Sequence, residues 1–215
     1  MNDLHGFIAF PLDAPFSWEG DGFEVRSWFG PDVYVEGGTI FGCVHERTTV
    51  VQGEDTVSLA AGSWFVAPGQ TRVRGGRGVA IRVPDYLGMR QTGGPIEAVG
   101  RLRYIDGCTD TLLVCPPRLG EPCLNHLHVP PGTDQSFHVH PSARVGTIVR
   151  GAGRCLTDAG ARDLSPGLGW IIPTGTRHAF RTTSSSLDVL AWHPDSDFGP
   201  TDENHPMLNR TWRRD

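Results

Sequence analysis

Short apolar runs separated by glycine and proline dominate this chain and limit what it can fold into. The 215 residues include 28 glycines and 17 prolines. Such punctuation breaks the chain into strand-length pieces, and we find no long amphipathic helix among them. No apolar run approaches the length of a transmembrane helix. The pattern predicts an all-β fold built of sandwiches or barrels.

The charge and cysteine content exclude several classes of function. The formal net charge is −5, with no long run of either sign, so we expect neither a nucleic-acid partner nor a membrane partner. The opening residues lack the basic and apolar regions of a signal peptide. The five cysteines are odd in number and irregularly spaced. We therefore expect free thiols and a cytoplasmic location.

Two histidines one residue apart, His138 and His140, lie in the stretch from Gly132 to Gly151. On a β-strand, residues two apart point to the same face. Two imidazoles on one face form half of a metal site, because histidine is the commonest metal ligand. A third histidine, His178, follows in the turn that begins at Pro173.

The two stretches resemble the motifs of a known family. Residues 132–151, with the His138-Val139-His140 triplet inside, resemble the first cupin motif, and residues 167–178, ending at His178, resemble the second. The resemblance implies tandem double-stranded β-helix (jelly-roll) barrels. It also implies that His138, His140 and His178 bind one divalent metal inside a barrel.

One departure from the family pattern concerns the glutamate that usually follows the second histidine. That position holds Arg144, and Val145 comes next. Three neutral imidazoles leave the metal its full charge and more open positions, which suits a substrate that chelates through oxygen, with or without dioxygen. Arg144 either binds the anionic end of that substrate or forms an ordinary surface ion pair. Fe(II) is the favoured ion, with Mn, Ni, Zn and Cu as alternatives.

The chain divides into two predicted domains. Residues 1–95 read as an N-terminal cupin-like barrel without ligands, and residues 96–215 as a metal-binding barrel with an extended tail. A weak internal repeat places Pro68 on Pro173, which puts Val73 where the second half has His178. The apolar residues of the tail predict that it packs on something, as an arm on a neighbouring barrel or as a lid.

Three further histidines are candidates for catalysis. His126 and His128 share one face of the strand before the first motif, and His193 ends the last strand. If the histidines of the pair face the barrel interior, they serve as acid–base groups. Alternation instead favours Leu127 and Val129 as interior residues, which would turn both histidines outward. The sequence has no GxSxG serine motif and no glycine-rich phosphate loop in a strand–helix context.

These features predict a metal-dependent enzyme, a non-haem Fe(II) dioxygenase for a diketone, enol, hydroxy acid or phenol. Two alternatives stay open. The first is a non-oxidative isomerase, lyase or hydrolase, which would need a base near the metal. The second is a non-catalytic module that binds a small molecule. The partner we expect is a small-molecule substrate, and the tail leaves room for a homodimer.

Overall fold

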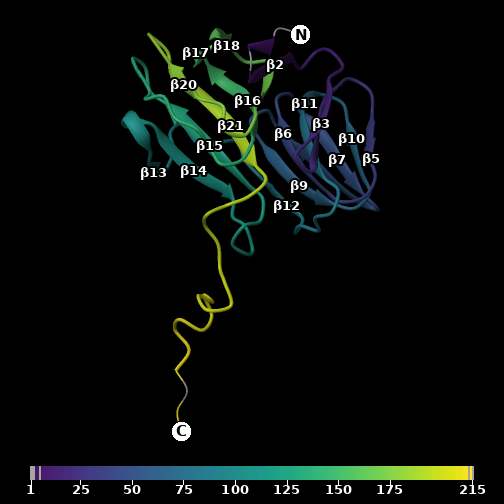
Figure 1. Ribbon diagram of the computed structural model, residues 1–215. Coiled ribbons are helices and arrows are strands. Elements are labelled where there is room, and N and C mark those ends of the chain that lie inside the picture. The colour runs from purple at the N-terminus through teal and green to yellow at the C-terminus, as the bar shows by residue number, and fades with distance from the viewer. Residues whose placement is uncertain (1–2, 5, 213, 215) are drawn as a thin grey trace.

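The fold is all-β. A computed structural model describes residues 3–4, 6–212 and 214. Within those residues every regular element is a β-strand except one 3-10 turn, η1 (Ile105–Gly107). Figure 1 shows two barrels side by side, with the C-terminal tail running away from them. No helix in the described part is long and apolar enough to cross a membrane.

The N-terminal barrel consists of two antiparallel sheets. The six-stranded sheet has the order β12-β9-β6-β11-β4-β3, and the four-stranded sheet has the order β5-β10-β7-β8. The strands are β3 (Ser17–Gly20), β4 (Phe23–Phe29), β5 (Val33–Val35), β6 (Thr39–Val44), β7 (Thr48–Gln52), β8 (Asp55–Leu59), β9 (Trp64–Pro68), β10 (Thr71–Arg74), β11 (Arg77–Val83) and β12 (Gln91–Gly93).

The C-terminal barrel pairs an eight-stranded sheet with a three-stranded one. Their orders are β1-β2-β19-β16-β21-β15-β14-β13 and β18-β17-β20. The strands are β1 (Asp3–Leu4), β2 (Phe7–Pro11), β13 (Leu102–Arg103), β14 (Thr109–Val114), β15 (Cys123–Val129), β16 (Arg144–Gly151), β17 (Gly153–Thr157), β18 (Gly160–Leu164), β19 (Leu168–Ile172), β20 (His178–Arg181) and β21 (Leu187–His193).

The two barrels repeat one topology. The order β9-β6-β11-β4 in the first matches β19-β16-β21-β15 in the second, and β10 pairs with β7 as β20 pairs with β17. Val73 on β10 is buried in the interior of the first barrel. His178 opens the equivalent strand β20. The weak sequence repeat therefore corresponds to a structural one.

The C-terminal barrel is extended by a strand from outside its own continuous run of chain. Strand β2 pairs with β19 of the C-terminal barrel, although it is the second strand of the chain. Strand β12, which follows β11 near the end of the predicted N-terminal domain, pairs with β9 of the same barrel. The division near residue 95 stays a prediction, and these pairings show that the first residues of the chain form part of the second barrel's sheet.

Three apolar clusters stabilise the molecule. One fills the N-terminal barrel around Trp28 and Phe65, and one fills the C-terminal barrel around Trp170 and Phe180. The third lies between the barrels, where Phe41 of β6 packs against Trp192 of β21 with ring centroids 5.7 Å apart. The large sheets are therefore covered on both faces, which explains the continuous burial of residues 39–44 along β6.

The tail leaves the barrels after His193. Its first part is held by the 118–121 turn, where the amide of Leu119 donates to Pro200 O at 3.0 Å. Four apolar side chains of the tail are exposed: Phe198, Met207, Leu208 and Trp212. The roles of arm and lid both stay predictions.

Candidate metal centre

His138 and His140 lie on the segment between β15 and β16. The prediction of a β-strand for this pair is wrong, because the segment is a loop in which His138 forms only an isolated bridge with His178. Prolines at 130, 131 and 141 flank the loop. Proline cannot donate a ladder hydrogen bond, so no continuous strand forms there. The bridge still aligns the two chains, since His138 and His178 exchange both backbone hydrogen bonds at 3.0 Å.

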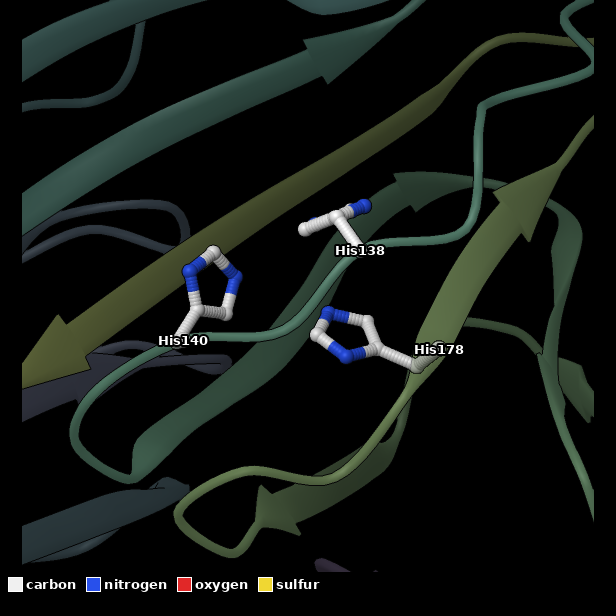
Figure 2. A group of neighbouring side chains, drawn as sticks. All are labelled: His138, His140 and His178. Atoms are coloured by element: carbon white, nitrogen blue, oxygen red, sulfur yellow. The ribbon is translucent and has the colours of Figure 1, made fainter.

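The three imidazoles converge at one point, as Figure 2 shows. The ring centroid of His138 lies 4.9 Å from that of His140 and 4.5 Å from that of His178. One ring nitrogen from each residue lies within 4.8 Å of the other two. The structure therefore brings together the three residues that the motifs single out, in a group that could hold a metal ion.

Hydrogen bonds fix the orientation of two of the rings. The Nδ1 of His138 donates to Ser136 O, and the Nδ1 of His178 donates to Thr176 O, both at 2.9 Å. In a neutral imidazole only one nitrogen carries the proton. The Nε2 atoms of both residues thus keep their lone pairs. Backbone carbonyls commonly orient metal-ligating histidines in this way.

The local electrostatics favour neutral imidazoles. Burial, followed by the positive charge of Arg144, lowers the pKa of His140 to about 3. Burial likewise lowers the pKa of His178 to about 4, against the hydrogen bond to Thr176 O. Only neutral imidazole can bind a metal, so these shifts keep both residues ready for one near pH 7. This donor set fits a divalent transition metal.

A cavity of about 350 Å³ opens beside the three histidines. Its walls combine apolar, polar and charged groups from both sheets of the C-terminal barrel and from the segment 102–104. Apart from the three histidines, the lining residues are Leu102, Arg103, Tyr104, Asp110, Asn125, Leu127, Gln135, Arg144, Trp170, Ile172, Phe180, Ala191 and His193. None of the described tail residues line it. A space of this size suits a small molecule.

Arg144 is half-buried in the cavity wall, and no ion pair joins it to another of the described residues. Its Nη1 donates to Ser142 O at 3.1 Å and to Ser142 Oγ at 2.6 Å. Burial lowers the pKa of Arg144, opposed first by Asp195, yet a guanidinium stays charged at neutral pH. Within the described residues all of its hydrogen bonds come from Nη1. Its Nε and Nη2 can therefore bind an anion.

His193 also lines the cavity, where its Nε2 lies 2.8 Å from the Sγ of Cys123. Burial, followed by the charge of Arg144, lowers the pKa of His193 to about 4. Burial raises the pKa of Cys123 to about 12. Both groups are therefore neutral near pH 7. The pair is not the thiolate–imidazolium couple that a cysteine nucleophile requires.

His126 and His128 do not reach the cavity. The residues of β15 that line it are Asn125 and Leu127, whereas His126 and His128 point to the opposite face of the strand. There they contact the buried Asp188. His126 Nε2 and His128 Nδ1 each lie 2.9 Å from Asp188 Oδ1. The interior positions of Leu127 and Val129 follow the predicted alternation. A role for either histidine as an acid or base at the metal is wrong.

Five polar residues of the cavity were missed by the sequence analysis: Gln135 and the four residues Arg103, Tyr104, Asp110 and Asn125. Asn125 has the same strand parity as Leu127, so alternation along β15 could have placed it inside. Asp110 is opposite Leu127 in the ladder between β14 and β15. That register cannot be read from the sequence, because β14 carries a bulge between Leu112 and Val114.

The four residues bring both signs of charge into the cavity. Burial raises the pKa of Asp110, against a hydrogen bond from Asn125, and burial also raises the pKa of Tyr104.

The cysteines follow the prediction of free thiols, with four of the five buried.

Comparison with known proteins agrees with this description. A family profile described as "Cupin domain" matches residues 125–193. No curated protein sequence matches the chain. Among solved structures, a cupin 2 conserved barrel domain protein from Leptotrichia buccalis is 12% identical, with a TM-score of 0.60, covering 91% of this chain and 92% of its own.

Two other solved structures have a similar fold. The salicylate 1,2-dioxygenase of Pseudaminobacter salicylatoxidans is 11% identical, with a TM-score of 0.60, covering 84% of this chain and 76% of its own. The protein Ylba of E. coli is 15% identical, with a TM-score of 0.59, covering 94% and 95%. At sequence identities this low, the structural similarity shows a shared fold alone.

Proposed function

The chain belongs to the cupin superfamily through its C-terminal barrel, and we propose that it is a metal-dependent dioxygenase acting on a small, oxygen-chelating acid. The observation that carries the proposal is the convergence of His138, His140 and His178 beside a cavity of about 350 Å³. Fe(II) is the ion we favour. A bound ferrous ion would supply the sites at which substrate oxygens and dioxygen meet.

The protein's own residues hold and orient the reactants. The carbonyls of Ser136 and Thr176 keep the Nε2 lone pairs of His138 and His178 free for the metal. Arg144, at the position of the usual glutamate, supplies a cation instead of a fourth anionic ligand. A carboxylate or enolate bound there gains a charge-assisted hydrogen bond in a partly dry site.

Apolar walls exclude water from the reacting centre. Leu127, Ile172 and Phe180 line the cavity, and Ile172 and Phe180 are buried in the barrel core. Such walls lower the local dielectric and strengthen the interaction between Arg144 and an anion. The fold shared with salicylate 1,2-dioxygenase supports a hydroxy acid or phenolic acid as substrate, although the fold alone does not determine the reaction.

Oxygen consumption tests the proposal directly. Protein loaded with Fe(II) without oxygen is mixed with aerated solutions of hydroxybenzoates, aliphatic hydroxy acids, diketones and catechols. We expect stoichiometric oxygen uptake with at least one acid, which is lost in His178→Ala and weakened through a higher KM in Arg144→Gln. Binding of an acid without oxygen uptake by any member of the panel would contradict dioxygenase chemistry.

A second function, non-oxidative metal catalysis, is favoured by His193. Its Nδ1 donates to Asp195 O, so the lone pair of the neutral imidazole lies on Nε2, beside the Cys123 thiol; there it accepts a proton from a bound substrate that displaces the thiol hydrogen. In that case the protein loaded with Zn, Ni or Mn converts substrate without oxygen, and His193→Gln lowers kcat more than it changes KM. If ligands bind but no ion supports turnover, a non-catalytic binding module remains.

A further inference from the structure

Two hydrogen-bonded residues, Asp110 and Asn125, lie in the cavity wall formed by β14 and β15. Asn125 Nδ2 donates to Asp110 Oδ1 at 2.6 Å. Asn125 Oδ1 is buried, and no described residue offers it a hydrogen-bond partner. Both residues line the same cavity as the three histidines. Asn125 thus forms part of the wall of the proposed substrate site, and its amide oxygen lies just below the surface of that wall without a partner among the described residues.

The orientation of the amide follows from its neighbour. An ionised carboxylate only accepts hydrogen bonds, so the NH₂ group of Asn125 must face Asp110 and the carbonyl must face away. A buried acceptor without a partner destabilises the folded protein. Folded proteins rarely retain such a group, and each one calls for an explanation such as a functional role.

A matching donor lies in the same cavity. Trp170 Nε1 is buried without a partner among the described residues, and Trp170 lines the cavity. Indole N–H can only donate, so it matches an oxygen acceptor on the ligand. Arg103 and Arg144 supply positive charge in the same walls. The cavity therefore offers several donors for an acid and one unpaired neutral acceptor.

We infer that the substrate carries, besides its acidic oxygens, a separate O–H or N–H group that donates to Asn125 Oδ1. This rests on the proposed function only in taking the cavity's occupant to be the substrate. Asn125 would then be a specificity-determining residue, because an analogue without the donor leaves its amide carbonyl unpaired. Sites built to bond a hydroxyl or amino group discriminate strongly against analogues that lack it.

Isothermal titration of ligand pairs tests the inference without turnover. Each pair differs by a methyl group in place of a donor of similar size. One series comprises 3-, 4- and 5-hydroxysalicylate and the corresponding aminosalicylates. Each is compared with the salicylate that carries a methyl group at the same ring position. A second compares glycerate with 2-hydroxybutyrate. The protein is loaded with Fe(II) under argon, and its metal content is measured in the same sample.

We expect at least one donor-bearing ligand to bind about tenfold more tightly than its methyl partner, as a hydrogen bond to an otherwise unpaired buried acceptor predicts. Asn125→Leu should abolish that preference and leave the methyl ligand's affinity unchanged or higher. The wild-type comparison stands even if the variant fails to fold.

The inference is overturned if no donor-bearing ligand is preferred, including the case in which no pair binds, or if Asn125→Leu keeps the preference. Failure of the proposed function is a separate result. It would be seen as absent metal or absent oxygen uptake in a protein that still prefers the donor.

Discussion

At the scale of single residues, buried polar groups with defined partners determine what each side chain can do. Asp188 shows this on the outer face of the C-terminal barrel. It is 2% exposed and accepts hydrogen bonds from His126 and His128, and Arg150 Nη2 lies 3.2 Å from its Oδ1. Burial alone would raise the pKa of Asp188. The hydrogen bonds from His126, Arg150 and His128 outweigh it and lower the pKa to about 2.

Asp188→Asn should lower the free energy of unfolding by about 3 kcal/mol, because the change leaves buried donors without their anion. The folded pKa lies below the unfolded value, so the carboxylate's contribution is present above about pH 4 and is lost as pH falls toward 2. Urea unfolding at pH 7 measures the effect. The matched control is Asp163→Asn, an exposed carboxylate paired with Arg154, which should change stability by less than about 1 kcal/mol. Equal effects of the two changes would contradict the account.

His193 predicts how the metal-free protein responds to acid. Its folded pKa is about 4, below the ordinary 6.5, so the unfolded state takes up a proton first as pH falls. Stability should therefore decrease between about pH 6.5 and pH 4, and His193→Gln should make that decrease shallower. Urea unfolding of apoprotein at pH 7 and pH 5 gives the slope. His205→Gln, in the exposed tail, is the control. An unchanged slope in His193→Gln would argue that this imidazole is not buried as a neutral group.

The residues of the metal centre were predictable to different degrees. His138, His140 and His178 follow from motif spacing, and the structure brings their rings together. The position of His126 and His128 outside the cavity depends on strand parity, which the sequence left open. Asp110 and Asn125 could not be paired in advance, because the bulge in β14 sets which residues are opposite each other.

At the scale of elements, strand β2 shows how a local apolar run acquires a distant partner. Phe10 pairs with Gly169 of β19 and is 1% exposed. A Cβ built on Gly169 would lie 2.4 Å from the Phe10 ring, so the ring fills the space that the glycine leaves. The first strands of the chain therefore complete the eight-stranded sheet, whose strands β15, β16, β19 and β21 line the cavity beside the metal centre.

Phe10→Ala should destabilise the protein by about 3–5 kcal/mol, through lost burial and the cavity that remains. Thermal unfolding measures the change, and Leu87→Ala, at a side chain that is 82% exposed, serves as the control. We also expect weaker metal retention in Phe10→Ala, since β19 supports the second motif. A change no larger than that of the control would show that β2 adds nothing to the C-terminal sheet.

Strand prediction succeeded where turn residues delimit an apolar run. The predicted strand before the first motif and the predicted last strand correspond to β15 and β21. Strands such as β2 and β11 were missed. Their partners in the sheet are not readable from local pattern, because pairing joins segments far apart in the chain. The strand prediction for residues 138–140 was wrong for a local reason. The prolines that flank this segment prevent a continuous strand despite the spacing of the two histidines.

At the scale of the whole molecule, the two barrels share an apolar core. Phe23 and Phe41 of the N-terminal barrel contact Trp192, with ring centroids 4.9 Å and 5.7 Å apart. Trp192 lies on the outer face of the C-terminal barrel's large sheet. The sequence predicted two barrels with similar topology. It could not predict which faces meet, because β6 and β21 have buried residues on both faces.

The shared core predicts that the barrels unfold together. Calorimetry of the full chain should show one transition, and a fragment of residues 96–215 should lack the fixed near-UV circular dichroism of packed tryptophans. The fragment loses β2 and exposes the face around Trp192. Two separate transitions in the full chain, or a native-like fragment, would mean that each barrel is independently stable.

The central claim is that His138, His140 and His178 form one centre for a divalent metal. The measurement that tests it most directly is elemental analysis of anaerobically purified protein after incubation with Fe(II) and desalting, beside His178→Ala and the tail control His205→Gln. The account predicts about one iron per chain in the parent and in His205→Gln, and almost none in His178→Ala. Equal metal content in all three proteins, or no retained iron, zinc, nickel, manganese or copper in the parent, would contradict the three-histidine centre.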